Sequence, residues 1–398
     1  MHISSIAVTA LGLAPSVFGA NLFVSHFSGT VYTLSYTPAT NGNGTLAIKS
    51  SATGCGRMPS WLSFDSPTKS LYCFDETGSW GGGSVVASFS VNGDGSLKQS
   101  GQAKSTGGEV HGSLYGGVNG TSFVAMAEYD PSTVSTYKLP LTSSSQVLQK
   151  EKFTMSQPGP VSSRQNAPHP HAIFKDPTGQ FLLAPDLGAD LIRIFSVDSS
   201  SGKLTACPAA QAGAGDGPRH GAWWIPNAGS TKGQMLYTVN ELSNTVSAWT
   251  VKYSSSGCMS LNKTQTLSAF APGKTPTAGR QPIKAAEVHV AGNFLYASVR
   301  NDQTFGSQQD SLATYAISST GELSFVESTK ANAWYPRTFS INKAGDLVAV
   351  GGQTSANVAI VSRNPTTGKL GGLVASIPVG SKGTDGGEDG LSAVVWAE

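Results

Sequence analysis

The chain has 398 residues, of which 39% are hydrophobic and 9% aromatic but only 13% are charged, and its formal net charge is +2. This hydrophobic content supports a large core and excludes a disordered chain. The small net charge and the absence of any run of Lys or Arg exclude a protein that binds the phosphate backbone of nucleic acids.

Residues 1–20 form an apolar segment that ends in small residues and is typical of a secretory signal peptide. The segment is too short to span a membrane, and no later segment is long enough, so no membrane association is expected. We therefore expect a signal peptide at residues 1–20 and a single domain at residues 21–398. The alternative for residues 1–20 is a buried N-terminal strand or helix.

Cysteine number and glycosylation motifs also favour export, to the medium or the cell wall. The even set of four cysteines permits three connectivities, of which the economical one joins Cys55 to Cys73 and Cys207 to Cys258. Asn-x-Thr sequons, which accept N-linked glycans, begin at Asn43, Asn119 and Asn262. Each sequon lies in a predicted turn that would tolerate a glycan.

Three turn signatures recur in chain order, and each marks the start of a short strand. A Gly-x-Leu sequence begins strands at Gly44, Gly95, Gly202, Gly321 and Gly368. A second glycine turn opens strands at Gly179, Gly233, Gly292 and Gly345, and a proline-centred turn opens apolar strands at Pro59, Pro170, Pro218 and Pro336. Units of four short strands with regular spacing are typical of β-propeller blades, and the chain holds seven such units.

The two ends of the chain complete each other. Residues 21–54 supply three strands of a blade, and residues 391–396 resemble the missing first strand. Joining them closes the ring and removes the open edge that would invite aggregation. We predict an all-β, seven-bladed β-propeller whose ring is closed by a C-terminal strand joining the N-terminal blade. A closed ring needs no partner to cover its edges, so a monomer is expected. Two tandem β-sandwiches are the alternative, but they do not explain the recurring order of the signatures.

Alignment of the units reveals two columns of polar residues on the two strands nearest the axis. The end of the second strand carries His26, Glu76, Glu128, Asp186, Glu241, Arg300 and Gln353. The first strand carries Trp61, His111, His171, Arg219 with His220, Glu287 with His289, and Arg337. Charged groups are costly to bury unless they are paired or functional, so blade-to-blade ion pairing is the alternative for any single member.

Four of these residues come from neighbouring units and should converge at one mouth of the channel: His171, Arg219, Glu241 and Arg300. His171 and Glu241 offer acid–base chemistry, and the two guanidinium groups offer paired donors for an anion. We predict these four as catalytic residues. We predict a substrate-binding role for His220, Asp186, His111 and Arg337. The expected substrate is a small anion.

The sequence lacks the motifs of several other kinds of enzyme and metal site. The sequence has no Gly-x-Ser-x-Gly, no His-Glu-x-x-His and no Cys-x-x-Cys, and the glycines of residues 78–83 fit a hairpin loop. His169 and His171 lie two residues apart as metal ligands can, but no third ligand follows nearby. We expect neither a metal nor a cofactor.

The motifs in order resemble those of a known family. They are His-Pro-His-Ala at 169–172, Pro-Asp-Leu-Gly-Ala-Asp at 185–190, Gly-Pro-Arg-His at 217–220 and Asn-Glu-Leu-Ser-Asn-Thr-Val at 240–246. They resemble the lactonase family of seven-bladed propellers, which includes 6-phosphogluconolactonase and the fungal 3-carboxy-cis,cis-muconate cyclase. The resemblance covers residues 21–396.

The pattern of the muconate cyclase falls on His171, Arg219, Glu241 and Arg300, with the last in the run Ala-Ser-Val-Arg. This resemblance implies a cofactor-independent cycloisomerase that closes a muconolactone from a small polycarboxylate. The first alternative is a lactonase that hydrolyses a sugar lactone such as 6-phosphogluconolactone. The second alternative is a secreted cell-wall glycoprotein or adhesin without catalytic activity.

Overall fold

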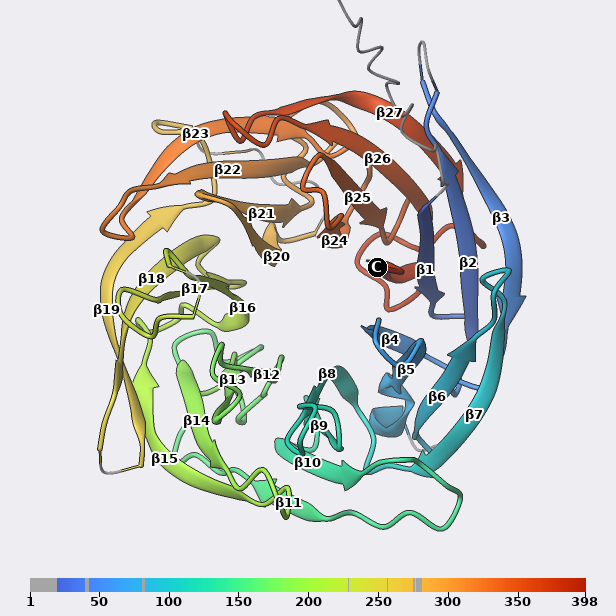
Figure 1. Cartoon of the computed structure of the whole chain (residues 1–398). Helices are drawn as coiled ribbons and strands as arrows, with labels where there is room; N and C mark the ends of the chain where they lie inside the picture. Colours follow the sequence, from blue (N-terminus) through green and yellow to red (C-terminus); the bar gives the residue numbers. More distant parts are fainter. Residues whose placement is uncertain are drawn as a thin grey trace, which may run out of the picture.

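Short apolar runs and glycine turns fold into seven four-stranded antiparallel sheets arranged as blades around a central axis (Figure 1). The computed structural model describes residues 20–39, 43–80, 83–227, 229–255, 257–274, 276 and 281–398. The predicted seven-bladed propeller is confirmed, and the tandem-sandwich alternative is wrong. The expected signal peptide lies outside the described residues except for Ala20, which begins β1. Within the described ranges, no helix has the length and hydropathy of a membrane span.

Each blade runs outward from the axis through four strands. The innermost strands are β4 (Pro59–Asp65), β8 (Glu109–Tyr115), β12 (Phe174–Lys175), β16 (Pro218–Trp224), β20 (Lys284–Ala291), β24 (Pro336–Ile341) and β28 (Leu391–Trp396). The second strands are β1 (Ala20–His26), β5 (Ser70–Asp75), β9 (Phe123–Glu128), β13 (Phe181–Asp186), β17 (Met235–Asn240), β21 (Phe294–Arg300) and β25 (Leu347–Gly352). The third strands are β2 (Thr30–Thr37), β6 (Val85–Val91), β10 (Thr133–Lys138), β14 (Leu191–Val197), β18 (Thr245–Tyr253), β22 (Ser311–Ile317) and β26 (Asn357–Arg363). The outermost strands are β3 (Thr45–Ala52), β7 (Leu97–Lys104), β11 (Gln149–Lys152), β15 (Leu204–Gln211), β19 (Met259–Ser268), β23 (Leu323–Lys330) and β27 (Leu370–Pro378). A short 3-10 helix, η1 (Glu76–Trp80), follows β5.

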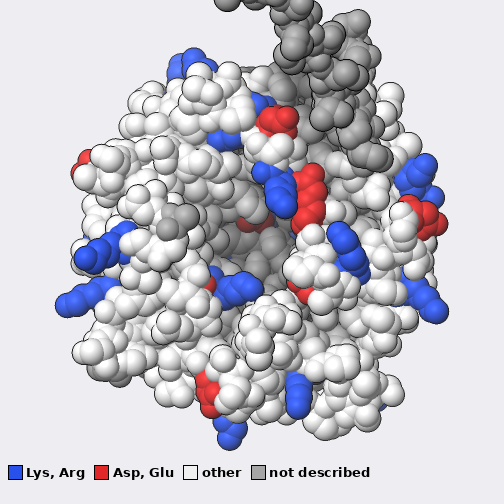
Figure 2. Space-filling model, in the orientation of Figure 1, with Lys and Arg blue, Asp and Glu red and all other residues white. Residues whose placement is uncertain are grey.

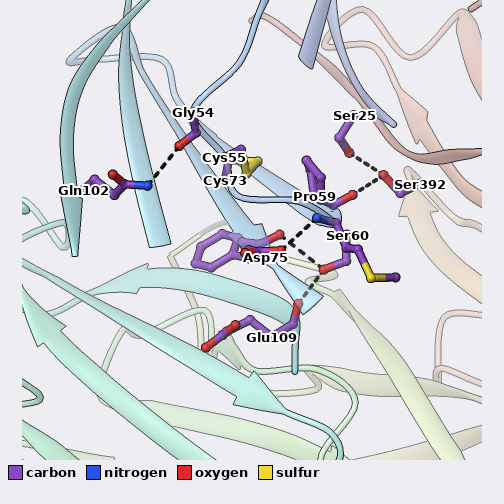
Figure 3. The surroundings of a disulfide bond; sticks show 12 residues. Ser25, Gly54, Cys55, Pro59, Ser60, Cys73, Asp75, Gln102, Glu109 and Ser392 are labelled. Carbon is purple, nitrogen blue, oxygen red and sulfur yellow. Dashed lines mark hydrogen bonds between the residues drawn. A yellow bond between two sulfur atoms is a disulfide. The ribbon is translucent and has the colours of Figure 1, made fainter. Parts of the chain in front are cut away.

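The ring closes as predicted. β28, from the C-terminal end, pairs antiparallel with β1, with Val394 opposite Val24, and the two strands lie side by side in one blade (Figure 1). The Ser392 hydroxyl donates to the carbonyl of Pro59 on β4 and lies 2.8 Å from the Ser25 hydroxyl on β1 (Figure 3). β28 thereby joins its own blade to the next one.

The core lies between neighbouring blades. In one cluster, Tyr237 of β17 packs with Leu295 of β21 and Tyr315 of β22. The Tyr237 hydroxyl also donates to the carbonyl of Gly321 at 2.8 Å, which links the blade to the Gly-x-Leu turn of the next blade. Gly321 has a φ of +87°, and a Cβ there would lie 2.4 Å from Met235 Cγ, so this turn requires glycine for both reasons.

Both expected disulfides are present. Cys55 pairs with Cys73, and Cys207 pairs with Cys258. The first joins the segment before β4 to β5, and it lies near the ring closure (Figure 3). The asparagines of all three sequons are exposed: Asn43, Asn119 and Asn262.

One blade departs from the predicted regularity. β12 has only two residues, and an isolated bridge between Pro170 and Asp186 precedes it. Proline has no backbone N–H for the ladder. The preceding N–H of His169 donates to the Asp186 carboxylate at 2.7 Å instead of to a strand carbonyl. The His-Pro-His segment is therefore largely irregular.

Candidate active site

β-Bulges in five of the innermost strands change the direction in which their side chains point. The register shifts between Pro59 and Trp61, Glu109 and His111, Pro218 and His220, Ala285 and Val288, and Pro336 and Thr338. A bulge interrupts the alternation of side chains and redirects the extra residue. In β16 that residue is Arg219, and both it and the next residue, His220, are buried.

Glu241, which directly follows β17, is the centre of an ionic cluster. Its Oε2 lies 3.0 Å from Arg219 Nε and 2.8 Å from Arg300 Nη2. Its Oε1 lies 2.7 Å from Arg164 Nη1. His171 Nε2 is 4.0 Å from Oε2. The four predicted catalytic residues thus lie together, with Arg164 as a fifth member.

The arginines determine the charge of Glu241. Burial alone would raise the pKa of its carboxyl group, but Arg164, Arg300 and Arg219 hold that pKa well below its ordinary value. Burial and the neighbouring Arg300 lower the pKa of Arg219 to about 9, so its guanidinium group stays charged at neutral pH. Glu241 is therefore an ionised carboxylate that balances the charge of the arginines.

His171 has the opposite character. Burial, Arg219 and His220 lower the pKa of its imidazole well below the ordinary value, and Glu241 only partly opposes them. The ring is neutral at neutral pH, and its Nδ1 is buried without a hydrogen-bond partner among the described residues. A neutral imidazole has a lone pair with which to accept a proton.

A cavity of about 220 Å³ lies beside this cluster. Its lining residues are Glu76, Val110, Tyr129, Asp130, Arg164, His171, Glu241, Lys284, Arg300, Arg337 and Glu388. Figure 2 shows a hollow at the centre of one face of the ring, with basic and acidic side chains at its rim. The cavity is smaller than a typical pocket for a drug-sized ligand, so it suits a small metabolite.

The other charged groups that line the cavity either form ion pairs or have shifted pKa values. Arg337 Nη2 lies 3.3 Å from Glu76 Oε2, and its Nη1 lies 3.5 Å from Glu388 Oε2. Burial raises the pKa of Glu76 to about 8, although Arg337 opposes the shift. Burial and Arg300 lower the pKa of Lys284 to about 8.

The predicted site residues divide into two groups. Arg337 lines the cavity with His171, Glu241 and Arg300. Arg219 does not line it and is only 1% exposed, because it lies beneath the Glu241 carboxylate.

Three of the four predicted substrate-binding residues lie elsewhere. Asp186 is occupied by Arg193, whose Nε donates to it at 2.8 Å, and by backbone N–H groups. His111 and His220 line a different cavity of about 290 Å³. The prediction expected both columns of polar residues to meet at one mouth of the channel, but the structure divides them between two cavities and internal ion pairs.

Six residues that line the cavity were not named from the sequence: Val110, Tyr129, Asp130, Arg164, Lys284 and Glu388. Arg164 belongs to an irregular segment between β11 and β12, where no repeat signature applies. Lys284 begins β20, so its position at the start of an innermost strand was a signal that could have identified it.

The pair His169 and His171 does not form a metal site. His169 Nδ1 lies 2.9 Å from the Tyr129 carbonyl, and its Nε2 lies 3.2 Å from Asn166 Oδ1, so both nitrogens have protein partners. In the part of the chain that the structure describes, no three His, Cys, Asp or Glu side chains group as metal ligands.

A seven-bladed propeller with a carboxylate, arginines and a neutral histidine at its channel defines the class of this protein. The sequence matches the family described as "Lactonase, 7-bladed beta-propeller" over residues 21–384, and the chain belongs to that family. The resemblance seen in the motifs is thereby confirmed, and so is the prediction of an enzyme.

Individual relatives carry lactonase names. The chain is 33% identical over 349 residues to "Probable 6-phosphogluconolactonase" of Arthroderma benhamiae, covering 87% of this chain and 83% of the relative. It is 28% identical to the 6-phosphogluconolactonase of Formosa agariphila, covering 62% of this chain and 65% of that protein.

A solved structure shares the fold. The periplasmic gluconolactonase PpgL of Pseudomonas aeruginosa has a TM-score of 0.76 and 24% identity, with 95% of this chain and 99% of that chain covered. The two sequence relatives have lactonase names, and neither is named as the predicted muconate cyclase.

Proposed function

We propose that the protein hydrolyses a sugar lactone. The observation that carries this proposal is the charge balance of the 220 Å³ cavity. Arg164 and Arg300 are paired with Glu241, and Arg337 is paired with Glu388 and lies beside the Glu76 carboxyl group, which is largely neutral at neutral pH. The lining therefore offers donors and acceptors together, which suits a substrate rich in hydroxyl groups. A tricarboxylate such as carboxymuconate would need several unpaired cations in a buried site.

The names of the relatives support the same substrate class. Two are 6-phosphogluconolactonases, one of them described as probable, and a protein of the same fold is a gluconolactonase. Lys284 is the cation of the lining that has no carboxylate within ion-pair distance among the described residues. It is the group best suited to bind a substrate phosphate if the substrate carries one.

In the proposed mechanism His171 is the general base. Its neutral imidazole takes a proton from a water molecule, and the water oxygen bonds to the lactone carbonyl carbon. The resulting imidazolium would be stabilised by the Glu241 carboxylate 4.0 Å away. The bond between the carbonyl carbon and the ring oxygen then breaks, and the imidazolium returns its proton to the leaving alkoxide. The product is the open-chain acid.

Arg300 has the position to stabilise the charge that develops on the carbonyl oxygen. It lines the cavity, and its guanidinium group is fixed by Glu241 Oε2 and the backbone carbonyl of Ala285. A donor fixed before the reaction stabilises the oxyanion without reorganisation. From the sequence, Glu241 was an equal candidate for the proton-transfer group, but its ionisation and three arginine partners favour a role in fixing the arginines.

Secretion and glycosylation are part of the proposal. The two disulfides, the exposed asparagines of the sequons and the apolar segment at residues 1–20 fit an exported protein. We also propose that the closed ring acts as a monomer.

The test is a hydrolysis assay on the purified protein with gluconolactone, 6-phosphogluconolactone and carboxymuconate. Acid release above the rate of spontaneous hydrolysis reports a lactonase, and loss of diene absorbance reports a cyclase. We expect acid release from at least one sugar lactone, with kcat reduced about 10²- to 10⁴-fold in His171→Asn. Arg193→Ala, a change of an arginine that is paired with Asp186 outside this cavity, should have wild-type kcat.

Two outcomes would contradict the proposal. Consumption of carboxymuconate without acid release from either lactone would restore the cycloisomerase. No turnover of any of the three substrates would favour the secreted glycoprotein without catalytic activity.

A further inference from the structure

Arg219 contacts His220, and His220 in turn contacts Glu287. Neither His220 nor Glu287 lines the 220 Å³ cavity. His220 Nε2 lies 3.2 Å from Arg219 Nη1. On its other side, His220 Nδ1 lies 3.0 Å from both carboxylate oxygens of Glu287. These three side chains are nearly or fully buried, with at most 3% of each residue exposed. A series of contacts thus runs from Glu287 through His220 and Arg219 to Glu241.

The donor-only character of arginine fixes the direction of the hydrogen bonds in this series of contacts. Arginine can only donate, so His220 Nε2 accepts from Arg219 and its proton must be on Nδ1. That Nδ1–H then donates to the Glu287 carboxylate. The same Arg219 Nη1 also donates to the Ala286 carbonyl at 2.7 Å.

The Glu287 end of this series of contacts is anchored by the backbone. Glu287 Oε1 accepts the backbone N–H of Val288 at 3.0 Å, and the backbone N–H of Glu287 donates to the Ser298 hydroxyl at 3.0 Å. The bulge of β20, between Ala285 and Val288, presents this carboxylate beside β16.

The ring of His220 cannot turn away from Arg219. The rings of Trp61, His111 and His171 surround it, with centroid separations of 5.2, 5.1 and 5.3 Å. His220 lines the 290 Å³ cavity, whereas His171 lines the 220 Å³ cavity, so the imidazole of His220 stands between the two.

We propose that Glu287 and His220 are positioning residues for the Arg219–Glu241 pair: they fix the plane of the Arg219 guanidinium group and, through it, the orientation of the Glu241 carboxylate. Neither touches the substrate in this arrangement. The kinetic consequence rests on the proposed lactone hydrolysis, whereas the hydrogen-bond arrangement itself does not.

The first test is independent of activity. In protein labelled with ¹⁵N-histidine, the ring nitrogen shifts of His220, assigned with the His220→Gln variant, report which nitrogen carries the proton. We expect the neutral Nδ1–H form at neutral pH, because burial and Arg219 hold the pKa of His220 well below its ordinary value. Glu287→Gln should retain this form, because the amide oxygen still accepts from Nδ1–H. Glu287→Ala should lose it.

The second test is kinetic, and it uses the same two variants. Glu287→Ala should lower kcat about 10- to 100-fold through misplacement of Arg219, with KM changed less than about twofold. Glu287→Gln should recover most of that loss. Glu322→Gln, at an exposed glutamate just before β23, is the control and should equal the wild type.

The outcomes separate this proposal from the proposed function. An Nε2–H or doubly protonated His220 would overturn the positioning role even in an active enzyme. Equal kcat in Glu287→Ala and wild type, with only a lower melting temperature, would also overturn it and leave a purely structural pair. A wild type without lactonase activity but with the expected Nδ1–H form would contradict the function and retain the hydrogen-bond arrangement.

Discussion

Glu128 and Glu241 are two buried glutamates near the ends of second strands, yet their carboxyl groups have opposite chemistry. The alignment of the units puts them in one column, but the strand register offsets them by one residue. Glu128 ends β9 opposite Thr133, whereas Asn240, and not Glu241, ends β17 opposite Thr245. Both are at most 1% exposed. Glu128 accepts from the Ser135 and Thr106 hydroxyls, and burial raises the pKa of its carboxyl group. Glu241 contacts three arginines, and its pKa lies well below the ordinary value.

The difference shows that one residue of register decides which neighbours a side chain meets, because successive residues of a strand point to opposite sides. Both carboxyl groups are buried, but only Glu241 lines the 220 Å³ cavity. The neighbours supply either hydroxyl groups, which leave the neutral acid favoured, or guanidinium groups, which favour the ion. The column of polar residues is therefore not one functional surface.

The largest effect is expected from Glu241→Gln. It leaves the buried arginines without a counter-charge, and breaking a buried ion pair costs about 3–5 kcal/mol. We expect that loss in the free energy of unfolding, measured by urea denaturation, together with loss of lactonase activity. A variant with wild-type stability would mean that solvent, and not Glu241, balances the arginines.

The next effect concerns the arginine that lines the cavity. Arg300→Ala should reduce kcat/KM for the lactone about 10²- to 10³-fold, as removal of an oxyanion donor does. Arg193→Ala is the control, because Arg193 is paired with Asp186 at 2.7 Å outside the cavity. An equal loss of activity in both variants would indicate general damage and would remove Arg300 from the proposed mechanism.

The two kinds of carboxylate should also respond oppositely to pH. Burial, with Glu128 nearby, raises the pKa of Glu109 from 4.5 to about 8. Between these values the folded state binds more protons than the unfolded state, so stability from Glu109 is full below about pH 4.5 and falls as pH rises, by up to about 1 kcal/mol per pH unit. The contribution of Glu241 is instead lost as pH falls through its lowered pKa.

The measurement is the free energy of unfolding at several pH values between about 5 and 8. Glu109→Gln should flatten the decline with rising pH, whereas Glu322→Gln, at an exposed glutamate, should not change it. Parallel curves for Glu109→Gln and wild type would show that Glu109 ionises normally in the folded protein.

The smallest effect is expected from Glu128→Gln. The amide retains an oxygen that can accept from Ser135 and Thr106, so stability at neutral pH should change by no more than about 1 kcal/mol, with no change in kcat. Urea denaturation and the lactone assay on this variant give the direct contrast with Glu241→Gln. A loss as large as that of Glu241→Gln would contradict the comparison.

The ring was predictable because its signals are local. Alternation with a period of two, glycine turns such as that at Gly321 and the complementary chain ends all act over a few residues or one repeat. The short β12 was less predictable, because its irregularity depends on the bond between the His169 N–H and Asp186, seventeen residues later.

The sequence by itself determined the strand units, the closed ring, the disulfide pairs favoured and the convergence of His171, Arg219, Glu241 and Arg300. Only the tertiary structure decided that Arg164 joins them, that Arg219 lies beneath the cavity and that His220 faces Glu287. The reason is physical: a repeat assigns each residue to a strand and a blade, whereas pairing and protonation depend on which side chains from other blades come within a few ångströms.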